Sequence, residues 1–208
     1  MSNLSLQRQG RTLWRFVGGI VRLAIELGLH HDPSTQGVFT EEMSQLRIRL
    51  WGIVIVHDRG TSILLGRPLG IAPYDSSTSR PSRSKSRLIS DCSEHFILSH
   101  PVAEIQADII NSLYTPTSQS LDTIIRQASR ITRIMVEFKS QLPEKYQRIF
   151  IGSEHLPTEQ QSQLVESITA DEGLTLLKIQ ISRILLLRNL FSSDHLAIEQ
   201  KHKCLSDG

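Results

Sequence analysis

Residues 49–68 read RLWGIVIVHDRGTSILLGRP, and this stretch decides the expected fold. From Leu50 to Val56 almost every residue is apolar. A helix that is apolar on all sides is buried on all sides, so we expect this segment to form the centre of a multi-helix core. Gly66 ends the helix because glycine readily adopts the left-handed conformation that follows a helix, and Pro68 cannot continue it.

The helix that contains this stretch is predicted to run from Glu41 to Leu65, with Thr40 as its N-cap. Asp58 lies among apolar neighbours near its end. A buried charge is costly unless it is paired, so we expect Asp58 to be at least partly buried and bound to an arginine from outside the helix. Arg67 is the first candidate for that partner, and Arg15 is the second.

Another helix is predicted before this one, because apolar residues recur at the spacing of one helix face. They are Leu13, Phe16, Val17, Ile20, Ala24 and Leu27. Gly28 is expected to end this helix in a left-handed conformation. Gly18 and Gly19 are expected to permit the close approach of another helix. Arg47, one turn before Trp51, is expected to lie over the indole ring.

The remainder of the chain also has helical patterning, and no alternation typical of strands is found. Helices are predicted at 96–114, with Pro101 either in the first turn or at a kink, and at 121–142. Thr169 and Glu172 form a capping box that begins a helix reaching about Phe191, and Ser193 caps a last helix to about Leu205. The expected class is all-α, with one domain over residues 1–208.

Residues 76–90, SSTSRPSRSKSRLIS, have a different composition. Serine and four basic residues predominate, so we predict a flexible basic loop. It could be a solvated connector, a patch that contacts phosphates, or a segment suited to phosphorylation.

Composition and motifs narrow the function classes. The 208 residues have a formal net charge of +2 and two cysteines, so neither a nucleic-acid surface over the whole chain nor a disulfide framework is expected. Its apolar runs are too short to span a membrane. No serine-hydrolase elbow, phosphate-binding loop or dinucleotide fingerprint occurs. His30, His31 and Asp32 are adjacent and do not have the spacing of metal ligands. We therefore expect neither an enzyme nor a metal site.

Two stretches resemble a known family: WRFVGGIVRLAIELGLHHDPS (14–34) and QLRIRLWGIVIVHDRGTSILLGRPLGI (45–71). They are similar to the fungal-specific transcription factor domain, the regulatory middle region of fungal six-cysteine zinc-cluster transcription factors. ILLLRNLF (184–191) is similar to a later helix of that domain. The residues that fall on the family pattern, which we take as structural motif residues, include Arg22, Gly28, His30, Arg47, Trp51, Asp58, Gly66, Arg67 and Pro68.

The sequence also departs from that family. Ile48 stands where arginine is usual, Gly52 where a second tryptophan is common, and Asn189 where proline is usual. Two cysteines cannot form the six-cysteine zinc cluster, so no cofactor is expected here and zinc belongs to full-length members only. The chain is expected to be a fragment of the domain, incomplete at both ends.

The resemblance implies a regulatory domain that controls RNA polymerase II transcription in the nucleus. It would bind a small-molecule effector or protein partners, including a second copy, without reading DNA sequence by itself. One alternative is a helical interaction scaffold or decoy dimerisation partner. Another is a small-molecule-binding helical domain or enzyme. A pocket with a few convergent polar groups is typical of a sensor, whereas a scaffold is solid.

Overall fold

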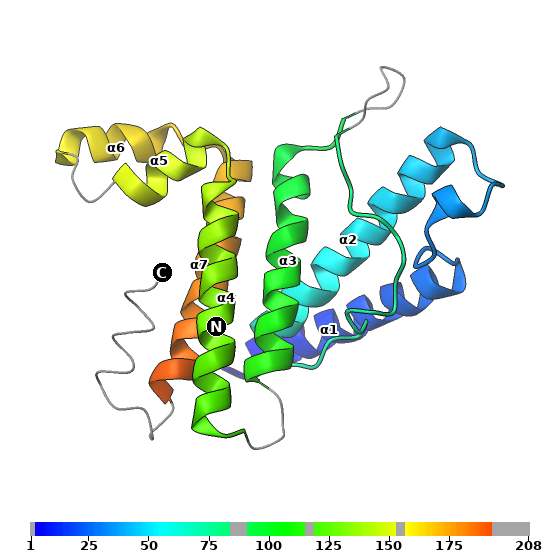
Figure 1. Ribbon diagram of the computed structural model, residues 1–208, viewed down its shortest axis with the longest axis horizontal. Coiled ribbons are helices and arrows are strands. Elements are labelled where there is room, and N and C mark those ends of the chain that lie inside the picture. The colour runs from blue at the N-terminus through cyan, green and yellow to red at the C-terminus, as the bar shows by residue number, and fades with distance from the viewer. Residues whose placement is uncertain (1–2, 84–90, 115–118, 153–156, 193–208) are drawn as a thin grey trace. The chain divides into compact units, whose positions relative to one another are not determined.

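A computed structural model describes residues 3–83, 91–114, 119–152 and 157–192. Within these residues the secondary structure is helical throughout and contains no strand, which confirms the all-α class (Figure 1). None of the described helices is both long and apolar enough to cross a membrane. The chain divides into two compact units, residues 1–110 and 111–208. Whether both form one regulatory domain over 1–208 stays a prediction.

The first unit begins with helix α1 (Asn3–Glu26), a short 3-10 turn η1 (Pro33–Thr35) and helix α2 (Glu41–Leu65). The predicted bounds of α2 are confirmed. The Thr40 hydroxyl accepts a hydrogen bond from the Met43 amide at 3.3 Å, and Gly66 follows the helix with φ 61°. Gly28 likewise has φ 67°. Positive φ carries no steric cost at glycine, so these two residues fix where the helices end.

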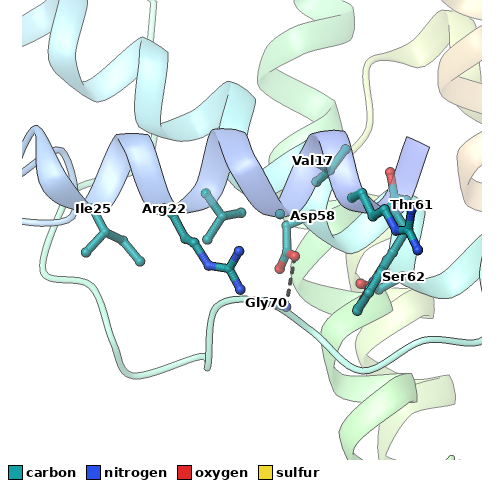
Figure 2. Close-up of a pocket in the computed structure, with 11 residues that line it drawn as sticks. Val17, Arg22, Ile25, Asp58, Thr61, Ser62 and Gly70 are labelled. Atoms are coloured by element: carbon teal, nitrogen blue, oxygen red, sulfur yellow. Dashed lines mark hydrogen bonds between the residues drawn. The ribbon is translucent and has the colours of Figure 1, made fainter. Parts of the chain in front are cut away.

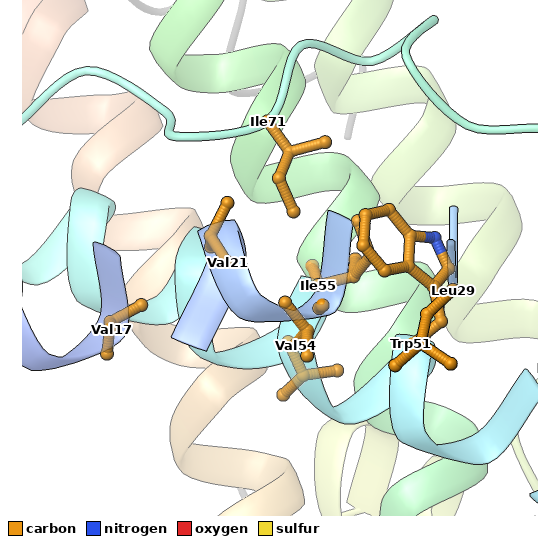
Figure 3. Close-up of a cluster of buried hydrophobic side chains, with 10 residues drawn as sticks. Val17, Val21, Leu29, Trp51, Val54, Ile55 and Ile71 are labelled. Atoms are coloured by element: carbon orange, nitrogen blue, oxygen red, sulfur yellow. The ribbon is translucent and has the colours of Figure 1, made fainter. Parts of the chain in front are cut away.

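Helices α1 and α2 pack against each other and enclose the core of the first unit (Figure 3). The core residues include Val17, Val21, Ala24, Leu29, Trp51, Val54, Ile55, Ile71 and Ala103. The expectation that α2 is buried on all sides is wrong, because Leu50 and Ile53 remain 41% and 43% exposed. Apolar composition shows that a helix can be covered, but neighbours from other elements decide which sides are.

After α2 the chain returns along that helix. The amide of Gly70 reaches Asp58, and Pro81 packs where a Cβ on Gly52 would stand. The described part of the predicted flexible loop, residues 76–83, makes specific contacts, which are described below. Residues 84–90 lie outside the described residues, and the flexibility of the whole loop stays a prediction.

Helix α3 (Glu94–Leu113) begins in the first unit, and its last three residues belong to the second. Pro101 lies inside this helix rather than in its first turn. The predicted start at residue 96 was two residues late.

The second unit contains α4 (Leu121–Ser140), α5 (Glu144–Gly152), α6 (Thr158–Glu166) and α7 (Ala170–Ser192). Helices α4 and α7 contact each other. Buried apolar residues of this unit include Ala128, Ile131, Met135, Tyr146, Ile179, Leu186 and Leu190. The short helices α5 and α6 were not predicted, since about two turns give little periodicity to detect. The helix expected after Ser193 lies outside the described residues.

The predicted capping box of α7 is confirmed. The Thr169 amide donates to Glu172 Oε2 at 2.9 Å, and the Glu172 amide donates to the Thr169 hydroxyl at 3.4 Å. Lys145 of α5 adds an ion pair, with its Nζ 2.8 Å from Glu172 Oε1. The bonds from Lys145 and then from Thr169 lower the pKa of Glu172 to about 2. Glu172 therefore fastens α5 to the start of α7.

Candidate functional site

Asp58 is a charged residue near the end of α2 that the fold engages from several sides. It is 4% exposed, which confirms that it is buried. Its carboxylate accepts hydrogen bonds from the amide of Gly70 at 2.9 Å and from the amide of Ile71 at 3.3 Å. It also forms an ion pair with Arg59, whose side chain is equally buried. Asp58 thus joins the end of α2 to the returning chain, and Figure 2 shows its bond to Gly70.

The predicted partners of Asp58 were wrong. The pairing residue is the adjacent Arg59, not Arg67 or Arg15. The guanidinium of Arg67 instead lies over the Trp14 ring, 5.8 Å from its centroid. Adjacent residues point in different directions on a helix, so Arg59 was not among the predicted partners. However, its side chain is long enough to bend back toward the carboxylate, and the returning chain supplies backbone donors that no sequence pattern identifies.

The guanidinium of Arg59 is a buried cation. Burial lowers the pKa of this group, while the negative charge of Asp58 opposes that shift. A buried ion pair is held in place when further hydrogen bonds satisfy its remaining atoms. Here the backbone amides of Gly70 and Ile71 do so on the carboxylate side. This arrangement fixes the Asp58 carboxylate between Arg59 and the returning chain.

The turn after α1 is bound by the serine-rich segment. The carbonyl of His30 accepts hydrogen bonds from the Ser77 amide at 3.0 Å and from the Ser76 hydroxyl at 3.1 Å. The Thr78 hydroxyl donates to the carbonyl of Leu29 at 2.7 Å. Residues 76–78 therefore hold the turn that joins α1 to α2.

Asp32 completes this connection. Its carboxylate accepts hydrogen bonds from Ser34 and, at 2.7 Å, from the Ser79 hydroxyl, and these bonds lower the pKa of Asp32. The centroid of the His30 ring lies 6.2 Å from that of the Trp51 ring, and burial lowers the pKa of His30. Among the residues that the structure describes, no group of three metal-ligating side chains gathers here or elsewhere. His30 is thus a packed turn residue.

Arg47 does not lie over Trp51 as predicted. Its guanidinium carbon is 4.4 Å from the centroid of the Phe39 ring, and its Nη2 donates to the carbonyl of Leu27 at 2.8 Å. The carbonyls at the end of α1 lack helical partners, so an arginine from α2 can satisfy one of them. Trp51 is buried in the core instead.

A cavity of about 290 Å³ lies between α1, the second half of α2 and Gly70 (Figure 2). Its walls combine apolar, cationic and hydroxyl-bearing side chains. They include Trp14, Val17, Val21, Ile25, Arg15, Arg22, Thr61, Ser62 and Asp58. Figure 2 shows the side chain of Arg22 extending from α1 toward the corner where Asp58 and Gly70 lie.

Gly18 also lines this cavity, and the prediction of close helix approach at Gly18 and Gly19 is wrong. A Cβ added to either glycine would meet nothing within 4 Å. Close approach occurs instead at Gly52, where a Cβ would collide with Pro81, and at Gly70, where it would lie 2.8 Å from Asp58 Oδ1.

Sequence reasoning missed the cavity, although one signal was present. Positions 15, 18, 22 and 25 share one face of α1 because residues three and four apart are neighbours on a helix. Two arginines flank a glycine on this face. Thr61 and Ser62 belong to a segment whose sequence is typical of a buried helix. Its pattern gave no sign that they line the same cavity as the two arginines.

Comparison with known proteins places these features in a family context. The chain is 30% identical over 70 residues to "Equisetin cluster transcription factor eqxF" of Fusarium heterosporum, covering 34% of this chain and 10% of that protein. It is 34% identical over 68 residues to "Zn(2)-C6 fungal-type transcription factor pigI" of Monascus ruber, covering 33% and 8%.

A longer stretch of the chain matches a protein of Schizosaccharomyces pombe. The chain is 27% identical over 161 residues to its "Uncharacterized transcriptional regulatory protein C1F7.11c", covering 69% of this chain and 19% of that protein. The chain therefore spans only a small part of the length of these relatives. No solved structure matches it significantly. Residues 4–192 match the family model described as "Fungal specific transcription factor domain", and the chain belongs to that family.

Proposed function

We propose that this regulatory domain acts in the nucleus on RNA polymerase II transcription by binding a small-molecule effector or a protein partner. The observation that carries the proposal is the family match over residues 4–192. The names of the relatives, which describe transcription factors and a transcriptional regulatory protein, support it. The chain spans at most 19% of the length of those three proteins. Any activity of a whole transcription factor is therefore proposed for this chain and not shown.

The cavity favours effector binding over a solid scaffold. It places hydroxyl and cationic groups beside apolar walls, which is the arrangement found in small-molecule sites. We propose binding without a catalytic step, because the one carboxylate of the cavity is held by Arg59 and two backbone amides. We also propose that the chain does not read DNA sequence alone, since two cysteines cannot build a six-cysteine cluster.

A second candidate is dimerisation with another copy of the chain. Apolar side chains on one face of α1 and in the turn directly after it are exposed, with spacings of three, seven and four residues. They are Leu13, Phe16, Leu23 and Leu27. Repeats of three and four are the spacing by which two helices pack along a common seam. Sedimentation of the full chain tests this candidate, and a monomer at micromolar concentration would exclude it.

The test of the main proposal is a transcription reporter in a fungal cell. The chain is inserted between an unrelated DNA-binding domain and an activation domain, and output is compared with the same fusion lacking the chain. A regulatory domain should change the output or make it depend on growth conditions, at equal protein abundance. Equal output from both fusions across conditions would contradict the proposal.

A further inference from the structure

We propose that the cavity between α1 and α2 binds a small organic anion, with its carboxylate on Arg15 or Arg22 and its apolar body against Val17 and Val21. Its regulatory role rests on the proposed function, but its binding chemistry does not. The charge, the free hydrogen-bonding groups and the size of the cavity support such a ligand.

Two cations of the cavity, Arg15 and Arg22, have no partner among the residues that the structure describes. Within the described parts of the chain, no ion pair, hydrogen bond or ring contact engages the guanidinium of Arg15 or Arg22, although both line the cavity. They are seven residues apart on α1, which places them about two turns apart on one face. A guanidinium can hold a carboxylate through two parallel hydrogen bonds. Both groups are exposed, so an arriving anion could pair with either one.

The acid in the same cavity does not cancel this positive charge. Asp58 is paired with Arg59, and its oxygens accept the amides of Gly70 and Ile71. Its negative charge is therefore already balanced inside the protein. The field offered to a ligand is that of Arg15 and Arg22, which attracts anions and repels cations.

The remaining walls fit an apolar body with one further polar group. Val17 and Val21 are buried on the α1 side, and the indole of Trp14 stands at the margin. The Ser62 hydroxyl donates to the carbonyl of Pro68 at 3.1 Å. Among the described residues the Thr61 hydroxyl has no hydrogen-bond partner, so it can bind a ligand. The volume of about 290 Å³ lies near the lower end of the usual range for ligand pockets, about 300–1,000 Å³, and favours a small ligand.

A tryptophan of the chain can serve as a spectroscopic probe of this site. Of its two tryptophans, Trp14 lines the cavity and Trp51 is buried in the core. In a nitrogen–proton correlation spectrum of the labelled full chain, each tryptophan gives one indole signal. We would titrate naphthalene-2-carboxylate, and naphthalene-2-methanol as a neutral probe of similar shape. The carboxylate should shift the Trp14 signal in a saturable way and leave that of Trp51 unchanged. It should bind about tenfold or more tightly than the alcohol, because hydrogen bonds between charged groups are stronger.

Two matched pairs of variants locate the binding. Gly18→Leu places a side chain in the open space of the cavity, whereas Gly19→Leu adds the same group beside it, outside the lining. Both replacements raise helix propensity, so both proteins should fold. Gly18→Leu should abolish the titration and Gly19→Leu should preserve it. Replacing both Arg15 and Arg22 with glutamine should weaken carboxylate binding about tenfold, and Arg8→Gln on the same helix should not.

Several results would overturn the inference. They are an unmoved Trp14 signal at millimolar probe, equal affinity for the acid and the alcohol, or equal behaviour of the two leucine variants. Each of these would reject an anion site in the cavity and leave the transcriptional role standing, because that role is measured separately with the reporter. Conversely, specific binding combined with a silent reporter would support the site and reject the proposed function.

Discussion

Replacing Asp58 with alanine should strongly destabilise the first unit. The carboxylate is the common acceptor for Arg59 and for the amides of Gly70 and Ile71. Alanine would leave a buried cation and two amides without their acceptor. Removing one member of a buried ion pair typically costs about 3–5 kcal/mol, mainly because the other charge stays buried and unpaired. That loss is a large fraction of the roughly 5–15 kcal/mol that stabilises a typical protein.

Chemical denaturation followed by tryptophan fluorescence provides the assay. Trp14 and Trp51 both belong to the first unit, so the signal reports that unit without interference from the second. We expect the free energy of unfolding of Asp58→Ala to fall by about 3–5 kcal/mol. A change within about 0.5 kcal/mol, as for an ordinary surface substitution, would refute the reasoning.

A second replacement tests whether the contact between Gly70 and the Asp58 carboxylate stabilises the protein, and not only whether Asp58 is buried. A Cβ on Gly70 would lie 2.8 Å from Asp58 Oδ1, so Gly70→Ala should push the carboxylate out of place. It should destabilise the native protein, but much less in the Asp58→Ala background, where there is no carboxylate to displace. Additive effects would mean that the two residues do not interact.

Three further predictions concern other parts of the chain. The pKa of Glu172 is about 2 in the folded chain, below its ordinary value of 4.5. The stability that Glu172 adds is therefore full above pH 4.5 and is lost as the pH falls toward 2, a dependence that melting curves should show and Glu172→Gln should lack. Gly52→Val should cost about 1–3 kcal/mol in chemical denaturation through collision with Pro81. Purified chain should show no sequence preference in gel-shift assays near physiological salt, and residual DNA binding should disappear as salt rises.

Local sequence signals predicted the bounds of helices well where capping residues mark the helix ends. Thr40 and Gly66 set the bounds of α2, and Thr169 with Glu172 set the start of α7. Each signal depends on hydrogen bonds within a few residues, so the sequence contains all that is needed to recognise it. Part of the family motif is a signal of the same kind, because Gly28 and Gly66 follow the ends of α1 and α2 with positive φ.

The candidate site was only partly predictable, because it depends on contacts between distant segments. Burial of Asp58 followed from its apolar neighbours, but its partners depend on where the chain after Gly66 returns. The bonds from residues 76–79 to the turn at His30 join positions more than forty residues apart. Likewise, Gly18 reads as a point of close approach until the structure shows that nothing packs there.

The central claim is that this domain regulates transcription through its α1–α2 unit, and the leucine pair tests it most directly. Reporter output is measured for the fusion described above with Gly18→Leu, with Gly19→Leu and with the unaltered chain, at equal protein abundance. The account predicts that Gly18→Leu, which fills the cavity, changes the output while Gly19→Leu matches the unaltered chain. Identical output from all three fusions would contradict the claim.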